Sequence, residues 1–167
     1  WADLSESDYG VALLNNCKYA YDIDDNVMRL TLLKAGNAPD PVADLGLHHF
    51  TYSIFPHEGS LQEGGVIEEA YALNVPLVTQ ETDQHDGELP SCKSFFTVDR
   101  PGVFIEAVKK AEKNNDTIVR LYEGHQTRGS LHLQNHLQPN SKVAEVDLLE
   151  RNAMEIHSND GDVEIKV

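Results

Sequence analysis

The sequence predicts a mainly β protein: an antiparallel β-sandwich with one short helix near residues 65–74. In several stretches apolar and polar residues alternate with a period of two, as in strands that have one face on a core. Asn, Asp and Gly residues mark turns between these stretches. The composition of the 167 residues, 40% apolar and 25% charged, is that of a globular domain. Many short strands and little helix favour a sandwich, and we expect a single domain over residues 1–167.

Four stretches are predicted to be half-buried antiparallel strands, because each has one apolar face. These faces consist of Met28, Leu30 and Leu32; Phe50, Tyr52 and Ile54; Leu131, Leu133 and Leu137; and Ala144, Val146 and Leu148. Turn residues are found at Asn15-Asn16, Asp24-Asp25-Asn26, Asn114-Asn115-Asp116 and Asp160-Gly161. Such residues tolerate left-handed backbone or cap their own turns, so hairpins are expected there.

Two segments depart from strict alternation. Residues 65–74 place Val66, Ala70 and Leu73 at helical spacing and are followed by Pro76, which predicts the one short helix. Residues 103–113 fit both periods, because Phe104 and Val108 have helical spacing whereas the residues around them alternate as in a strand. Periodicity alone leaves both possibilities open.

The two ends of the chain suggest a piece of a longer protein. The chain starts with Trp1, and residues 1–9 look like sequence from the middle of a protein. At the other end Val163, Ile165 and Val167 alternate as a final strand that stops abruptly. A strand left unpaired at a sheet edge can pair with a second copy, so we expect that self-association is possible there.

The charge balance excludes several classes of partner. The chain has 28 acidic and 13 basic residues, a net charge of −15 with neutral histidines, and the basic residues are scattered. Nucleic acids and anionic membranes need clustered cations, so neither is an expected partner, whereas neutral sugars remain open. No apolar run approaches the length of a membrane span. Cys17 and Cys92 lie in no metal-binding spacing, and two buried thiols are favoured over a disulfide.

The histidines predict no metal site. His48 and His49 are adjacent and would point to opposite faces of a strand, and His132 and His136 would lie too far apart along one. His57-Glu58 and His85-Asp86 form no known motif. We therefore expect His48, His49, His132 and His136 to be solvated surface residues, and we expect no cofactor in this chain.

Two long loops, residues 34–46 and 79–91, are the places where binding residues are expected on a rigid sheet. Asp40 and Asp44 in the first loop could both be aimed at a ligand, although acids that cap local turns are the favoured alternative. Tyr19 and Tyr21 could share one strand face as a sugar-stacking platform, and a core position is equally compatible with the sequence.

A set of short motifs goes beyond these patterns. The chain resembles the C-terminal region of glycoside hydrolase family 38 α-mannosidases, in the branch with cytosolic, vacuolar and bacterial enzymes. The matching residues, which run in register to about position 150, include Tyr9-Gly10-Val11-Ala12-Leu13-Leu14-Asn15, Ala38-Pro39-Asp40-Pro41, Ala43-Asp44, Phe50-Thr51-Tyr52, Pro56-His57, Glu69-Ala70-Tyr71 and Val119-Arg120-Leu121-Tyr122-Glu123.

The resemblance implies a fold and a place in a larger enzyme. The fold would be the family's C-terminal sandwich, similar to the mutarotase-like supersandwich, which favours a strand over residues 103–113. The family hydrolyses α-mannosides with retention, through an aspartate nucleophile and a divalent metal, usually zinc. The residues for that chemistry belong to an N-terminal barrel domain, and none maps onto this chain. No catalytic or metal-binding residue is therefore expected here, and the chain alone is expected to be inactive.

In the intact enzyme, the resemblance implies that the sandwich packs on the barrel domain. The loop of residues 34–48 would reach the rim of the substrate cleft, with Asp40, Asp44 and His48 as its candidate residues. The substrate would be an α-mannoside or oligosaccharide, and the location the cytoplasm or the vacuole. The alternative is an autonomous, lectin-like carbohydrate-binding module.

Overall fold

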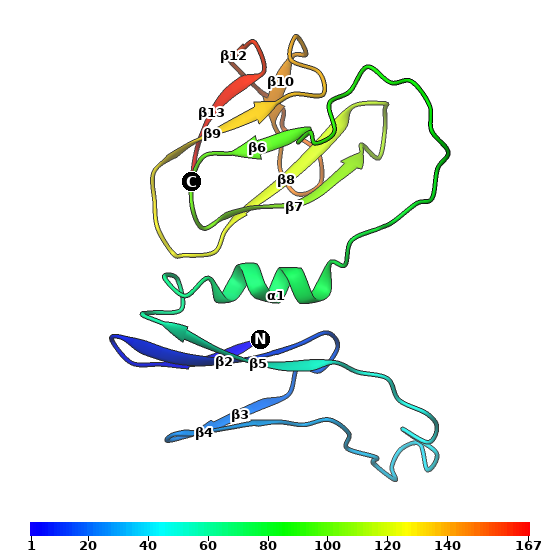
Figure 1. Cartoon of the computed structure of the whole chain (residues 1–167), viewed down its shortest axis with the longest axis vertical. Helices are drawn as coiled ribbons and strands as arrows, with labels where there is room; N and C mark the ends of the chain where they lie inside the picture. The colour runs from blue at the N-terminus through cyan, green and yellow to red at the C-terminus, as the bar shows by residue number, and fades with distance from the viewer. The chain divides into compact units, whose positions relative to one another are not determined.

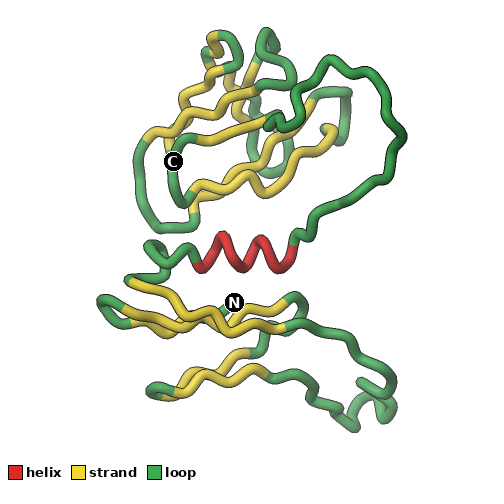
Figure 2. Tube along the Cα trace, viewed as in Figure 1, coloured by secondary structure: helices red, strands yellow, loops and turns green.

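Thirteen strands and one helix make up the computed structural model, which describes all residues from 1 to 167 (Figures 1 and 2). Every strand pair is antiparallel. The predicted fold class, mainly antiparallel β with a single short helix, is confirmed. The chain divides into two compact units, Trp1–Thr82 and Asp83–Val167, each with its own strands. That both units form one domain stays a prediction.

The first unit has a three-stranded sheet with the order β1-β2-β5, formed by Ala2–Ser5, Tyr9–Asn15 and Tyr52–Glu58. Strands β3 (Tyr21–Asp24) and β4 (Val27–Leu30) form a separate hairpin. Asp25 in its turn has a φ of 54°, the left-handed backbone that the Asp24-Asp25-Asn26 sequence predicts. Strand β4 includes Met28 and Leu30 of the predicted apolar face and ends before Leu32.

Helix α1 (Val66–Asn74) packs on one face of the three-stranded sheet and confirms the predicted helix. The core between helix and sheet consists of Ala12, Leu14, Val66 and Ala70, with Phe55, Leu61 and Leu73 packed around it. Gly65, at a φ of 67°, starts the helix, and Glu68 and Glu69 in the first turn interact favourably with its dipole. The helix ends two residues before Pro76, as expected for a residue that cannot continue it.

The buried face of β5 is the opposite of the one that the sequence predicts. Tyr52 and Ile54 are 54% and 68% exposed, whereas Phe55 contributes to the core and His57 is buried. The pairing explains this result, because Ala12 lies opposite Phe55 and is itself covered by the helix. Directly opposite residues share a sheet face, so the odd-numbered residues of β5 must point inward.

The second unit has a four-stranded sheet with the order β12-β13-β9-β6. The strands are Ser158–Asn159, Asp162–Lys166, Ser130–Asn135 and Phe96–Val98. A long hairpin of β7 (Val103–Lys110) and β8 (Thr117–Glu123) and a short pair, β10 (Val143–Glu145) with β11 (Met154–Ile156), complete the unit. The core consists of Val103, Leu131 and Leu133, with Phe96, Val98, Ile105, Val119, Leu121 and Ile165 packed against it.

Two predicted strands of this unit are shorter than expected. Leu131 and Leu133 are buried as predicted, but Leu137 lies beyond the end of β9 and is 47% exposed. Leu148 likewise lies beyond β10 and is 82% exposed. Both leucines lie beyond the end of their strand. No sheet therefore determines which side chains are buried there, although the sequence still alternates.

The ambiguous segment, residues 103–113, is strand β7 as far as Lys110. A register shift between Ile105 and Ala107 places Glu106 in a β-bulge. A bulge inserts one extra residue into one of two paired strands. Val103, Ile105 and Ala107 still show the strand alternation that is one of the two possibilities in the sequence, whereas Val108 is 48% exposed.

The final strand is confirmed, and one of its edges is partly unpaired. Strand β13 pairs with β9 along its whole length, whereas β12 pairs only with Asp162 and Val163. The two-residue turn between β12 and β13 is Asp160-Gly161, both with positive φ. The backbone from Glu164 to Lys166 has no strand on its second side. Self-association through this edge stays a prediction.

Candidate functional site

The candidate loop, residues 34–48, connects β4 to β5 in the first unit and has no regular secondary structure. Asp40 and Asp44 are both exposed on it. The Oδ1 atom of Asp40 accepts a hydrogen bond from the backbone N–H of Val42 at 3.0 Å. The Oδ2 atom of Asp44 accepts one from the N–H of Ala35 at 2.9 Å. The Asp40 carboxylate therefore caps a local turn, the alternative that the sequence favours, whereas the Asp44 carboxylate bonds to a residue nine positions earlier in the loop.

His48 is joined to Asp44 through the backbone. Its Nε2 atom lies 2.9 Å from the carbonyl oxygen of Asp44. A carbonyl oxygen only accepts hydrogen bonds, so Nε2 is the nitrogen that carries the proton. Asp44 and Ala35 both have left-handed backbone, with φ values of 61° and 50°. The structure thus brings Asp44 and His48 together and leaves Asp40 in its own turn; their place at a substrate cleft stays a prediction.

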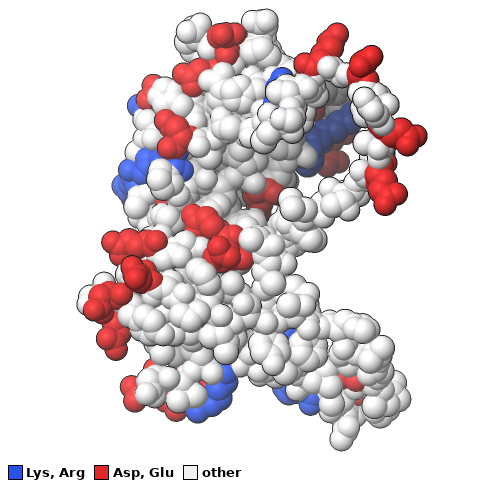
Figure 3. Space-filling view, in the orientation of Figure 1, with Lys and Arg blue, Asp and Glu red and all other residues white.

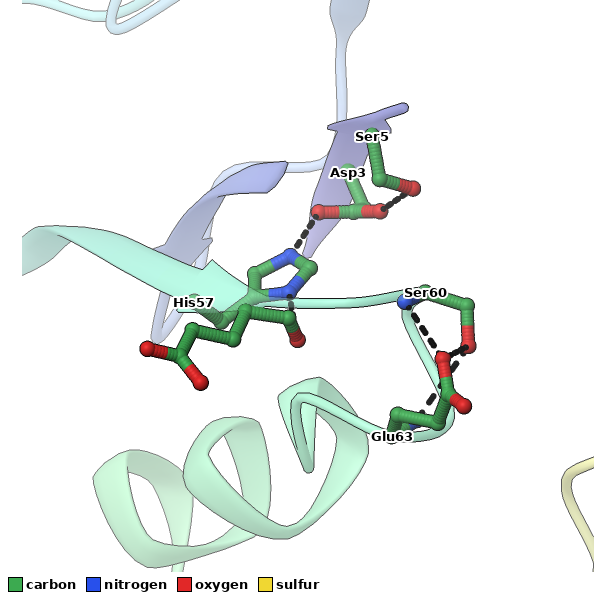
Figure 4. A network of polar contacts seen from close by, with 6 residues as sticks. Asp3, Ser5, His57, Ser60 and Glu63 are labelled. Carbon is green, nitrogen blue, oxygen red and sulfur yellow. Dashed lines mark hydrogen bonds and ion pairs between the residues drawn. The ribbon is translucent and has the colours of Figure 1, made fainter. Parts of the chain in front are cut away.

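A second polar cluster, which the sequence does not predict, lies in the three-stranded sheet (Figure 4). It joins Asp3 of β1 to His57 of β5, whose side chains are only 4% and 2% exposed. His57 Nε2 lies 2.8 Å from Asp3 Oδ1, and His57 Nδ1 lies 3.3 Å from the backbone oxygen of Glu58. The Ser5 hydroxyl donates to Asp3 Oδ2 at 2.8 Å. Strand β2 separates the two partners, so this pair spans the sheet.

The surroundings of His57 favour its charged form. The hydrogen bond to Asp3 raises the pKa of His57, and burial opposes that rise only in part. Both ring nitrogens face oxygen acceptors, so neither is free to take a proton from a nucleophile. The Ser5 hydroxyl contacts Asp3 and not the imidazole. The three residues therefore lack the geometry of a Ser-His-Asp triad and act as a buried ion pair between β1 and β5.

Sequence reasoning missed this pair because the partners are 54 positions apart. It noted only that Glu58 follows His57, and that carboxylate does not pair with the ring. The available signal was the two glycines that enclose the imidazole. A Cβ atom on Gly10 or on Gly64 would overlap the His57 ring. A glycine within an apolar strand, as Gly10 is, often marks such a close approach.

The turn that leads from β5 into α1 is held by Glu63 (Figure 4). Its carboxylate accepts hydrogen bonds from the backbone N–H and the hydroxyl of Ser60, at 2.9 and 2.8 Å. The bond from the Ser60 backbone lowers the pKa of Glu63. This reciprocal arrangement fixes the entry to the helix and contributes no reactive group.

The other histidines and the cysteines supply no metal site. His132 Nδ1 lies 3.0 Å from Asp162, whose hydrogen bond raises the pKa of this exposed histidine. No group of three or more His, Cys, Asp or Glu side chains in the chain could hold a metal ion. The resemblance places the divalent metal of the family in the barrel domain, outside this chain. Cys17 and Cys92 are free, but both are exposed, so the prediction of buried thiols is wrong.

The tyrosine platform, one of the two possibilities that the sequence left open, is not formed. Tyr21 lies in β3, and its hydroxyl donates to the backbone oxygen of Leu13 at 3.1 Å. Tyr19 precedes the strand and is 92% exposed. The two rings therefore do not share a strand face. In the same chain, no helix has the length and apolarity that crossing a membrane requires.

Two family models match the chain, one in each unit. The model described as the glycosyl hydrolases family 38 C-terminal domain matches residues 1–42, and the one described as the family's C-terminal beta sandwich domain matches residues 102–167. The chain belongs to glycosyl hydrolase family 38. Asp40 falls inside the first match, whereas Asp44 and His48 lie between the two matches.

Three relatives are similar to this family 38 chain over most of its length. It is 44% identical over 155 residues to alpha-mannosidase 2C1 of Mus musculus and 42% identical over 155 residues to alpha-mannosidase 2C1 of Homo sapiens. Each of these two matches covers 90% of this chain and 14% of the relative. Alpha-mannosidase G of Dictyostelium discoideum is 43% identical over 124 residues, which are 74% of this chain and 11% of the relative. The chain thus spans a small part of the relatives it matches.

Proposed function

We propose that the chain is the non-catalytic C-terminal β-domain of a retaining α-mannosidase that hydrolyses terminal α-mannosides. One observation carries this proposal: 90% of the chain is 44% identical to a relative named alpha-mannosidase 2C1, of which it covers only 14%. An identity of 44% over 155 residues supports the same fold for the two chains, and we infer that this chain occupies the corresponding place in its own parent protein. The rest of the parent supplies the catalytic barrel domain, its nucleophile and its divalent metal, which we expect to be zinc.

The chemistry of this chain supports a non-catalytic role. A retaining glycosidase needs two carboxyl groups about 5 Å apart, one as nucleophile and one as acid. The candidate acids Asp40 and Asp44 instead accept hydrogen bonds from two separate backbone N–H groups of their own loop. The buried Asp3 is paired with His57 and sealed from substrate. The carboxylates at these positions therefore hold the domain in shape.

The loop of residues 34–48 is the part of this domain that we assign to the rim of the substrate cleft. Its support is the combination of exposed polar side chains with a backbone held by its own carboxylates. A loop fixed in this way can present a side chain to a sugar without a large loss of conformational entropy on binding. The sandwich would then support the barrel domain and complete its cleft.

Kinetics of the full-length parent protein test the proposal. The full-length protein is expected to hydrolyse 4-nitrophenyl α-mannoside, and the isolated chain to release no product. Alanine at Asp40, Asp44 and His48 in the full-length protein is expected to change KM or kcat, whereas Glu69→Ala on the exposed side of α1 should change neither. Unchanged constants for all three loop variants would count against the rim assignment, and hydrolysis by the isolated chain would contradict the non-catalytic role.

A second candidate function, an autonomous carbohydrate-binding module, is favoured by one feature of the second unit. A shallow groove of about 500 Å³ is lined by Asn140, Lys142, Glu155, His157 and their neighbours. Alternating donors and acceptors of this kind suit the hydroxyl groups of a sugar. Binding of the isolated chain to a glycan array, lost in Glu155→Gln, would support this function. An array without signal would leave the first proposal standing alone.

A further inference from the structure

The strongest unassigned feature of the candidate loop is the free ring nitrogen of His48. The Nε2–H group donates to the carbonyl oxygen of Asp44, which fixes both the tautomer and the orientation of the ring. In the neutral imidazole the other nitrogen, Nδ1, then carries a lone pair and no proton. The structure gives Nδ1 no partner within the chain, and the side chain is exposed.

The backbone that holds His48 is itself fixed. Asp44 accepts at its carboxylate from Ala35 and at its carbonyl from His48, so one residue ties both ends of the loop together. Asp44 and Ala35 have left-handed backbone, a conformation that residues with a Cβ rarely adopt without such support. The imidazole is therefore held in place before any ligand arrives.

Among the three candidate residues, His48 offers the acceptor that a sugar can cover at the lowest cost. Asp40 and Asp44 are carboxylates, and removing a charged group from water is expensive unless it is paired. An imidazole in its neutral form carries no charge and loses far less hydration when it is covered. A sugar hydroxyl is a good donor for such a nitrogen.

We propose that His48 Nδ1 is a hydrogen-bond acceptor for one hydroxyl group of the mannoside, and thereby a specificity-determining contact of the cleft rim. This inference rests on the proposed function, because it needs the loop to reach the cleft. It assigns to Asp44 the positioning of His48 and to Asp40 only the stability of its own turn.

Two substitutions separate the sugar contact from a purely structural role. His48→Gln keeps an N–H donor near the position of Nε2, so the bond to Asp44 can persist, but it removes the Nδ1 acceptor. His48→Asn places an amide oxygen near Nδ1 and loses the reach to Asp44. A sugar contact predicts that KM rises in the His48→Gln variant and that the His48→Asn variant is closer to wild type. A merely structural role predicts the reverse order.

The experiment is a kinetic cycle in the full-length protein. KM and kcat are measured for 4-nitrophenyl α-mannoside and for its monodeoxy analogues, with wild type, His48→Gln and His48→Asn. We expect His48→Gln to raise KM for the parent sugar by about three- to tenfold, the usual loss for one hydrogen bond. For one deoxy sugar this penalty should disappear, because the hydroxyl that makes the contact is already absent.

The readouts also distinguish failure of this inference from failure of the proposed function. If the full-length protein hydrolyses mannosides and His48→Gln matches wild type on every analogue, the inference is overturned while the function stands. If the full-length protein hydrolyses no α-mannoside, the proposed function itself fails. Long-range ¹⁵N NMR of the isolated chain provides an independent check, since it should show the proton of neutral His48 on Nε2; a proton on Nδ1 would overturn the inference.

Discussion

Asp3 and His57 are the buried charged side chains that hold the outer strands of the first sheet together. Their exposures of 4% and 2% leave almost no water to stabilise either charge alone. Removing one partner of such a pair typically costs about 3–5 kcal/mol, because the other charge stays behind unpaired. A unit of this size has a stability of roughly 4–12 kcal/mol, so the pair represents a large share of it.

The pair predicts a pH dependence for the first unit. The pKa of His57 is raised above its ordinary value of 6.5 in the folded state, chiefly by the Asp3 hydrogen bond. Stability from this group is therefore fully present below pH 6.5 and is lost as the pH rises through the folded-state pKa. Urea midpoints read from the fluorescence of Trp1, the only tryptophan, should fall between about pH 6 and about pH 9.

Asp3→Asn should remove this part of the pH dependence. Because the Asn amide oxygen can still accept a hydrogen bond from His57, the stability of the first unit near pH 6 should fall by about 2 kcal/mol, less than for loss of a whole partner. Asp22→Asn is a matched control, because it breaks an exposed ion pair with Arg29 and should change stability by less than about 0.5 kcal/mol. NMR titration of the His57 ring measures the same effect directly. An unshifted NMR titration midpoint of His57 in the wild type would contradict the prediction. Equal urea midpoints for Asp3→Asn and Asp22→Asn would also contradict it.

Single residues show where sequence reasoning is sufficient and where it is not. Turn-capping by Asp40 could be foreseen, because Asp in a loop bonds to backbone close by, but the bond from Ala35 to Asp44 spans nine positions and could not. The link from His48 to the Asp44 carbonyl was not foreseen, since it depends on left-handed backbone at Asp44 that no local pattern demands. The Asp3–His57 pair was not foreseen either, because only the strand order brings the two residues together.

At the scale of elements, the sequence predicted which segments are strands better than which face of each strand is buried. The helix and the buried leucines of β9 were predicted correctly because the apolar residues of each element lie on one face. The buried face of β5 was wrong because both of its faces contain large apolar residues, and only pairing with Ala12 decides between them. The bulge in β7 was not predicted either, because it depends on the pairing of β7 with β8 and not on the residues of β7 alone.

Strand β5 is also an edge strand, and Pro56 interrupts the backbone groups on its free side. The bonds from Asn16 to Thr51 and from Gly59 to Asp8 show that odd-numbered residues face β2, so Pro56 faces outward. Proline has no N–H group to offer a second chain. Tyr52 and Ile54 beside it are exposed, and without the proline these apolar side chains would favour pairing of this edge with a second chain.

Pro56→Thr should therefore promote self-association through β5. The substitution restores a donor in the middle of a seven-residue edge strand that has apolar side chains beside it. Sedimentation velocity over a range of concentrations should show a larger mean mass than the wild type. Adding Ile54→Lys should reverse the effect, because a lysine on an edge opposes pairing. A variant as monomeric as the wild type at every concentration would show that β5 is protected by something other than Pro56.

For the whole molecule, the dominant physical property is its negative charge. The net charge is −15, and Asp and Glu side chains outnumber Lys and Arg on the face drawn in Figure 3. Residues 51–92 contain no lysine or arginine at all. This distribution repels phosphate backbones and is compatible with a neutral sugar or with another domain of the same protein.

The division of the chain into two units predicts where a protease cuts first. Residues 75–95 have no regular secondary structure, and Leu77 and Val78 are 95% and 97% exposed. Local unfolding for cleavage costs least where few apolar contacts are broken. Glutamyl endopeptidase should therefore cut at Glu81 or Glu88 and give two fragments of about 9 kDa, and Glu81→Gln with Glu88→Gln should slow this cut.

Each fragment should keep its β-sheet circular dichroism, because each unit has its own core. Co-elution of the fragments would support the predicted single domain, separate elution would contradict it, and a first cut inside β2 or β9 would contradict the division itself.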